Sequence, residues 1–183
     1  ELFATIATLN QNGVMDQATV DKLSDSLAER IQNSAPRKIF TTADIKIIKV
    51  ETKQAIQNYD AEIGKLLYKK YPMNEKIINV IEESFTKDDD INTETLSKLD
   101  PIIKQLEEII NGMVATDVSS GLSLLHLDLI NGFQGVKENL NDIKLVDSDP
   151  IVTIGAISQY LDNNDKIDTT IQKLALEIMR KKN

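Results

Sequence analysis

Residues 121–133, GLSLLHLDLINGF, decide the fold of this chain. At about 100° per residue, their leucines, isoleucine and phenylalanine point in nearly every direction around a helix. A helix with apolar residues on all sides is either buried inside a larger soluble domain or spans a membrane. The run is shorter than the roughly 20 residues that a membrane span needs, and His126, Asp128 and Asn131 interrupt it. We therefore expect residues 120–143 to form the buried central helix of a soluble bundle.

The rest of the sequence predicts an all-α fold, a single bundle of about six to eight helices around this central one. Helical spacing of apolar residues supports it, and the 183 residues include only seven glycines and four prolines. Thr41 and Asp44 have the spacing of a capping box. The β-branched segment 45–50, IKIIKV, could form a strand, but its continuity with the downstream pattern favours a helix. The other expected helices cover residues 2–9, 15–33, 41–71, 74–86, 93–114, 150–161 and 167–179.

Capping and breaking residues indicate where the later helices begin and end. Asp149 followed by Pro150 has the order of an N-cap and a first helical residue. The polar run 162–164 is expected to end the helix that this pair starts. Gly132 and Gly135 lie inside the central helix, where each costs about 1 kcal/mol relative to alanine. We expect a neighbouring helix to approach closely at these glycines.

The chain is expected to comprise an N-terminal helical segment, residues 1–35, and the bundle domain, residues 36–183. A heptad-like seam from Val20 to Ile31 suits either an intrachain contact or a dimer face, so the oligomeric state stays open. The chain starts at Glu1 rather than Met. This start fits a segment that ends a helix from a removed leader, or a membrane tether upstream of residue 1.

Charge and composition limit the classes of partner. The formal net charge is −8 and the isoelectric point is about 4.7, which argues against binding to nucleic acid or to an anionic membrane. The basic clusters 69–70 and 180–182 fall at expected helix ends, where they complement the helix dipole. Without cysteine, the chain has no disulfide, thiolate metal site or cysteine nucleophile. We expect a protein partner.

His126 is the only histidine, so the chain cannot form a histidine pair or a catalytic triad with a second one. Asp128 lies two residues further on, nearly on the opposite side of the helix, and cannot orient the imidazole. We interpret His126 as a core or boundary residue with one hydrogen bond. Asn131 is interpreted as a hydrogen bond between helices rather than a ligand contact.

Two acidic segments, residues 88–92 and 162–165, have oxygen ligands of the kind that calcium prefers. Neither has glycine at the sixth position, and Leu99 and Lys173 stand where an EF-hand has its twelfth-position glutamate. We interpret both segments as solvated turns. No Glu-x-x-His pair or phosphate-binding loop is present either. The sequence therefore predicts no catalytic, cofactor-binding or metal-binding residue, and no cofactor.

Three patches carry a resemblance to known proteins: FTTADIKIIK followed by Tyr59, SGLSLLHLDLINGF, and DSDPIVTIGAISQY. In this order, over about residues 40–160, they resemble a group of uncharacterised helical proteins of small-genome candidate bacterial phyla. Those proteins are typically predicted to be exported, with an N-terminal signal or a membrane anchor. The resemblance implies an extracytoplasmic domain of a cell-envelope or surface protein, and it brings no known activity. The absence of cysteine fits a cytoplasmic protein equally well, which is the alternative location.

Three functions fit the sequence. The first is a non-catalytic interaction or structural module, because core and capping signals are strong and no catalytic constellation is present. The second is a carrier of a small apolar ligand, held in a cavity beside the central helix. The third is an enzyme that uses carboxylates alone or with a metal. We expect the first and do not expect an enzyme.

Overall fold

The computed structural model describes residues 37–49, 51–68, 73–84 and 92–182. The chain divides into two units, Glu1–Arg37 and Lys38–Asn183. The second unit contains the bundle. The expected N-terminal helical segment 1–35, with its seam from Val20 to Ile31, lies outside the described residues.

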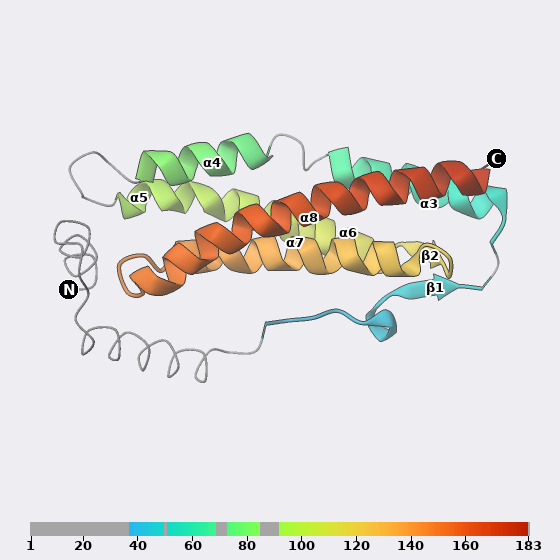
Figure 1. The fold of residues 1–183 in the computed structure, drawn as a ribbon, viewed down its shortest axis with the longest axis horizontal. Helices are drawn as coiled ribbons and strands as arrows, with labels where there is room; N and C mark the ends of the chain where they lie inside the picture. Colours follow the sequence, from blue (N-terminus) through green and yellow to red (C-terminus); the bar gives the residue numbers. More distant parts are fainter. Residues whose placement is uncertain (1–36, 50, 69–72, 85–91, 183) are drawn as a thin grey trace, which may run out of the picture. The chain divides into compact units, whose positions relative to one another are not determined.

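The second unit is mostly helical and also has two short parallel strands (Figure 1). Its elements are η1 (Thr42–Asp44), β1 (Lys46–Ile48), α3 (Lys53–Tyr68), α4 (Met73–Ser84), α5 (Thr93–Leu96), η2 (Ser97–Leu99), α6 (Asp100–Ala115), β2 (Asp117–Ser119), α7 (Ser123–Ile143) and α8 (Pro150–Lys182). The predicted helical class is confirmed. The described part has five helices of twelve residues or more, which is fewer than the six to eight expected.

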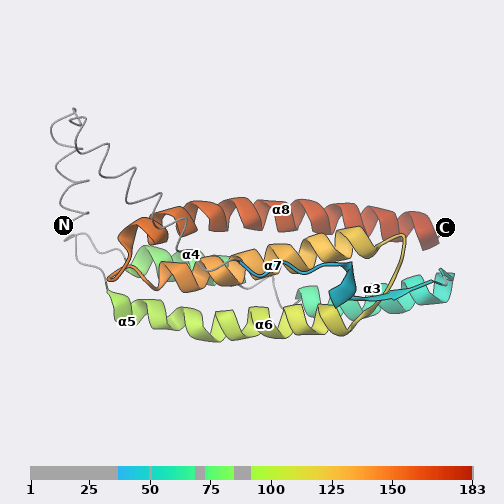
Figure 2. The same ribbon diagram turned by 90° about the horizontal axis from the view of Figure 1, so that it is seen from below.

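The helices form four antiparallel rods: α3 with α4, α5 with α6, then α7, then α8 (Figures 1 and 2). The rod of α7 packs against α6 and α8, and α3 contacts α6 and α8 from the other side. Buried apolar side chains from all these helices and from β2 join in a hydrophobic cluster. Burial of this shared cluster is the main force that holds the rods together.

The expected central helix corresponds to α7, which is 21 residues long. Leu122, Leu129 and Phe133 are buried as predicted, and Leu125 is half-buried. The prediction of burial on all sides was wrong in one respect, because Leu124 is 69% exposed. A rod in a four-rod bundle has neighbours on two sides, so part of its surface remains open to solvent.

The prediction of one helix over residues 41–71 was wrong at its start. Thr41 and Asp44 do form a capping box, but it opens only the single 3₁₀ turn η1. The following β-branched residues form β1, which pairs in parallel with β2 in the register Ile47 to Val118. Strand pairing with β2, which lies between the expected helices 93–114 and 120–143, outweighs the helical pattern here. A new cap at Thr52, whose hydroxyl accepts from the Ala55 amide, then begins α3.

The segment before β1 runs along α7 and is tied to it by a side chain (Figure 2). The Asn131 amide accepts from the Phe40 N–H at 2.8 Å and donates to the Phe40 carbonyl at 3.0 Å. These two bonds have the same pattern as the reciprocal N–H to carbonyl hydrogen bonds between paired residues of two β-strands. Asn131 was predicted to join two helices, whereas its partner is this extended segment.

The helix that begins at Pro150 does not break at residues 162–164 as predicted, and α8 continues to Lys182. The Asp149 cap is confirmed, since its carboxylate accepts from the Val152 N–H at 3.2 Å. Asn163 stays helical because its side chain has a partner on α7: it donates to Asn139 at 2.9 Å. Asn139 in turn donates to Gln159 at 3.2 Å. Asparagine is only a weak helix breaker, and these tertiary bonds outweigh its preference for turns.

Close approach of a helix at the two glycines of α7 is confirmed. A Cβ atom on Gly132 would lie 2.7 Å from Cγ1 of Ile167, and one on Gly135 would lie 2.9 Å from Nδ2 of Asn163. Both neighbours belong to α8. The absence of side chains at these two positions allows the backbones of α7 and α8 to approach each other.

Alanine substitution should therefore have opposite effects at Gly132 and at Gly64. Around Gly64, on α3, a Cβ atom would meet nothing within 4 Å. We expect Gly64→Ala to raise the free energy of unfolding by about 0.5–1 kcal/mol through helix propensity. Gly132→Ala should lower the free energy of unfolding by about 1 kcal/mol, because the cost of overpacking against Ile167 exceeds the gain from helix propensity. Urea denaturation measures both, and equal stabilisation by the two variants would contradict the close packing.

Candidate functional site

His126 lies fully buried between three helices. Its Nε2 is 3.0 Å from the Met113 carbonyl oxygen on α6, and its Nδ1 is 3.0 Å from the Tyr59 hydroxyl on α3. A carbonyl oxygen only accepts, so Nε2 carries the proton and donates. Nδ1 then accepts from the Tyr59 hydroxyl. The Tyr59 and His126 rings also meet edge to face, with their centroids 5.6 Å apart.

The surroundings of His126 keep the imidazole neutral. Burial lowers its pKa to about 4, and the hydrogen bond to Met113 offsets only part of this. Burial also raises the pKa of Tyr59, helped by the nearby Asp60 carboxylate. The prediction that His126 is a core residue is confirmed, with two hydrogen bonds rather than one. Because both ring nitrogens have protein partners, the imidazole joins α3, α6 and α7.

The other predicted positions do not come together with His126. Asp128 is exposed and, like Lys166, lines a hollow between α7 and α8. The acidic residues 162–165 lie within a regular turn of α8 rather than in a loop. Of the acidic segment 88–92, only Asn92 is described, and its side chain caps α5 by accepting from the Thr95 N–H at 3.1 Å. Within the described ranges, no three His, Asp or Glu side chains cluster as a metal site would require.

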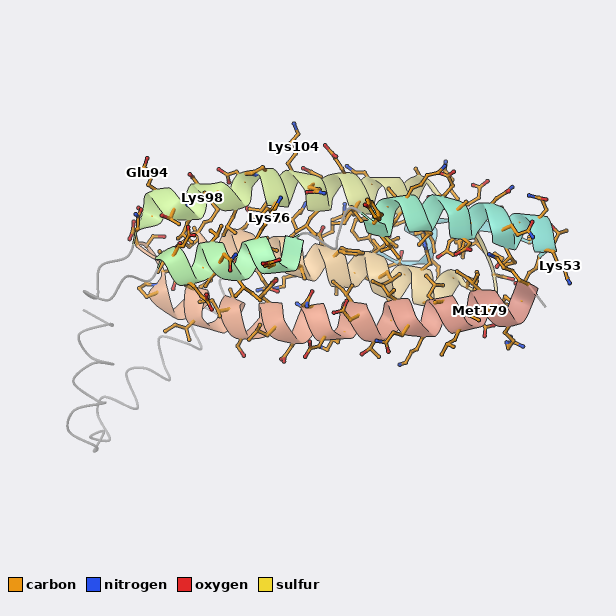
Figure 3. All side chains as sticks on the ribbon, turned by 90° about the horizontal axis from the view of Figure 1, so that it is seen from above. Lys53, Lys76, Glu94, Lys98, Lys104 and Met179 are labelled. Carbon is orange, nitrogen blue, oxygen red and sulfur yellow. The ribbon has the colours of Figure 1, made fainter. Side chains whose placement is uncertain are left out.

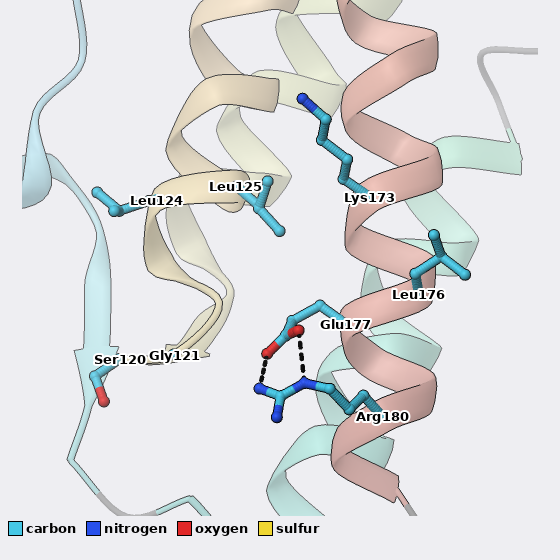
Figure 4. A pocket seen from close by; sticks show the side chains of 8 residues that line it. All are labelled: Ser120, Gly121, Leu124, Leu125, Lys173, Leu176, Glu177 and Arg180. Carbon is cyan, nitrogen blue, oxygen red and sulfur yellow. Dashed lines mark hydrogen bonds and ion pairs between the residues drawn. The ribbon is translucent and has the colours of Figure 1, made fainter.

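A groove lies between the first turn of α7 and the last turns of α8 (Figure 4). We call it the α7–α8 groove, and its volume is about 560 Å³. It is lined by the Ser120–Gly121 turn and by the side chains of Leu124, Leu125, Lys173, Leu176, Glu177 and Arg180. Three of these side chains are leucines, and two of the three charges are positive. The groove is therefore apolar and cationic, in a protein whose net charge is −8.

Ion pairs fix the end of the groove that is nearest the C-terminus. Arg180 donates to both carboxylate oxygens of Glu177, at 2.9 and 2.5 Å, and this holds the pKa of Glu177 below its usual range. Lys181 bonds to Glu51, next to the turn at Gly121. Lys173 has no ion pair with any residue that the structure describes. Its ammonium group is thus available at the rim.

The outer face of α8 carries a row of exposed apolar side chains. Ile154, Leu161, Leu176 and Met179 are between 47% and 67% exposed. At about 100° per residue, the last three lie within about 40° of Ile154 around the helix. We call these four residues the α8 stripe. Leu176 belongs both to the stripe and to the α7–α8 groove.

The sequence interpretation missed the α8 stripe. Ile154 and Leu161 fall in the expected helix 150–161 and Met179 falls in the expected helix 167–179, with a break between the two. Once α8 is continuous, one register covers residues 150–182, and it separates a buried face with Tyr160, Ile167 and Leu174 from the exposed stripe. The sequence does contain a signal for the stripe: the helical spacing of apolar residues continues without a break over residues 150–182, and these residues fall on two faces of the helix.

Comparison with models of known protein families, with curated proteins and with solved structures finds no match for this chain. In the part of the bundle that the structure describes, no helix is both long enough and apolar enough to cross a membrane.

Acidification should weaken the fold through His126. The folded pKa of about 4 lies below the unfolded value of 6.5, so between these values the unfolded chain binds the extra proton. Stability is therefore complete above pH 6.5 and falls as the pH drops. We expect a loss of about 2 kcal/mol between pH 6.5 and 5, where most carboxylates stay ionised.

NMR titration of the single histidine gives its pKa in the folded protein directly. Urea denaturation at several pH values gives the change in the free energy of unfolding with pH. In the variant His126→Phe, the free energy of unfolding should no longer fall between pH 6.5 and 5, because phenylalanine does not titrate. A wild-type histidine pKa near 6.5 would contradict the buried neutral imidazole.

Proposed function

We propose that this bundle is a non-catalytic interaction module that binds a protein partner through the outer face of α8. The α8 stripe carries this proposal. Four large apolar side chains are exposed on one face of α8 over 26 residues, in two pairs with Asp165 and Gln172 between them, and this exposure favours burial against another molecule. At about 1.5 Å per residue the row extends over about 38 Å, which is long enough for a helix-to-helix contact.

The charges beside the stripe favour a protein over a membrane or a nucleic acid. Asp162 flanks its first half, Lys173 and Arg180 flank its second half, and Asp165 lies between the two halves. A helix that lies on an anionic membrane has mostly Lys and Arg along its polar face. A rim with both signs of charge around an apolar centre is typical of protein interfaces.

The buried polar groups support a structural rather than a catalytic role. His126 uses both ring nitrogens in bonds that join helices. Asn139 likewise is fully buried and joins α7 to α8 through its side-chain amide. The resemblance of residues 40–160 to exported and membrane-anchored helical proteins adds a location to the proposal: the module is part of the cell envelope or surface, outside the cytoplasm.

A carrier of a small apolar ligand is the second candidate. The observation in its favour is the α7–α8 groove, whose volume of about 560 Å³ lies in the range of small-molecule sites. It lies beside the first turn of α7, next to Leu124 and Leu125. Its lining includes the unpaired Lys173, so a ligand with an anionic end suits it better than a purely apolar one.

Photo-crosslinking in the source cells tests the interaction module. A benzophenone amino acid replaces Leu161 or Leu176 on the stripe, or Lys104 as control; Lys104 extends from α6 on the side of the bundle away from α8 (Figure 3). We expect both stripe positions to give the same crosslinked polypeptide, and Lys104 to give none. Reversing the nearby charge with Asp162→Lys should reduce this product.

Other crosslinking results would reject the proposed function. Absence of a product at both stripe positions would do so, as would equal labelling at Lys104. Attachment of a small molecule at Leu176 alone, with no polypeptide product at Leu161, would favour the carrier instead.

A further inference from the structure

We infer that the partner of the α8 stripe is a second copy of this chain, paired antiparallel along α8 about a twofold axis. This inference rests on the proposed function, because it identifies the molecule that covers the same face. A symmetric dimer requires a surface that is complementary to itself. The outer face of α8 meets that requirement in both its charges and its apolar residues.

The charges of α8 change sign along its length. Residues 150–168 contain three aspartates and one lysine, and residues 169–182 contain four basic residues and one glutamate. In a parallel pair of α8 helices, like charges would face each other. In an antiparallel pair, the acidic half of each helix faces the basic half of the other. The charge pattern therefore selects the antiparallel direction.

The positions of Asp162 and Lys173 around the helix fit the same arrangement. At about 100° per residue, Asp162 lies about 80° from Ile154 and Lys173 about 100°, so both lie along one edge of the stripe. A twofold axis perpendicular to an antiparallel pair brings this edge of one helix against the same edge of the other. Asp162 of one copy can therefore pair with Lys173 of the other, and the symmetry forms this pair twice.

One register that brings apolar residues together also allows these ion pairs. When Leu161 lies opposite Leu176 of the second copy, Asp162 lies opposite Ala175. Lys173 of the second copy is then two residues from Asp162, or about 3 Å along the axis, within reach of a lysine side chain. In this register Met179 lies against Ser158, a small residue that leaves room for it.

Both members of the proposed ion pair are exposed and available. Neither Asp162 nor Lys173 forms a hydrogen bond or an ion pair with another residue in the described ranges. Arg180, by contrast, already binds Glu177 within its own helix. Asp162 and Lys173 are thus the charges on this edge whose reversal leaves the contacts described within the bundle unchanged.

Sedimentation velocity on the purified full chain, over a wide range of concentrations, tests the dimer. We expect a reversible dimer that Leu161→Glu abolishes. Asp162→Lys and Lys173→Asp, each alone, should raise the dissociation constant by roughly tenfold or more, because each creates two like-charge contacts. The double variant Asp162→Lys with Lys173→Asp should restore it to within about threefold of wild type. Lys104→Asp, on the far side of the bundle, is the matched control and should leave the constant unchanged.

Three results would overturn the inference: a monomer at every concentration, a dimer that persists in Leu161→Glu, or a dimer unaffected by the single reversals. Because all substituted side chains are exposed, unchanged helical circular dichroism and melting temperature confirm that each variant is folded. A monomeric protein that still crosslinks from Leu161 to a different polypeptide would reject the second copy and keep the interaction module. A monomer without any crosslink would reject both.

Discussion

Close packing between α7 and α8 is the contact on which the rest of the bundle depends. Gly132 and Gly135 let Ile167 and Asn163 of α8 approach the backbone of α7. This proximity brings Asn163 within hydrogen-bond distance of the buried Asn139. Those bonds keep α8 helical where its sequence favours a turn. The continuous α8 in turn reaches the far end of the bundle, where it contacts α3 and completes the fourth side.

The same contact also determines which surface remains exposed. Since α8 must present Ile167 and Leu174 to the core, its phase is fixed, and the α8 stripe must face away from the core. A break at residues 162–164 would have let the two halves rotate independently and bury more of these side chains. The exposed apolar row is therefore a consequence of the uninterrupted helix. The fold leaves these side chains exposed, and another molecule can bind to them.

The parts of the structure that follow from local patterns could be predicted from the sequence. The helix α7, its buried Leu129 and Phe133, the cap at Asp149 and the close approach at the glycines each depend on neighbouring residues or on helical spacing. The interpretation of His126 succeeded because a single histidine on a mostly apolar helix is more often a buried, hydrogen-bonded residue than a catalytic or metal-binding one. The parts that failed depend on distant partners. Segment 46–48 is a strand because Asp117–Ser119 lies beside it, and the sequence alone does not reveal that pairing. The α8 stripe was missed for the same reason, since continuity through Asn163 requires its partner Asn139 on α7.

The tie between Phe40 and Asn131 constrains how the chain folds during synthesis. These residues are 91 positions apart, and Lys46 pairs with Asp117 over a similar separation. At about 5–20 residues per second, roughly 5–18 s pass on the ribosome between the appearance of Phe40 and that of its partner. Ile45, Ile47 and Ile48 have neither strand β2 nor helix α7 to cover them until residues 117–119 follow, about 70 residues later. The β-branched run of this segment therefore stays without its native partners while about 70 further residues are synthesised, and an uncovered strand edge is a site of aggregation.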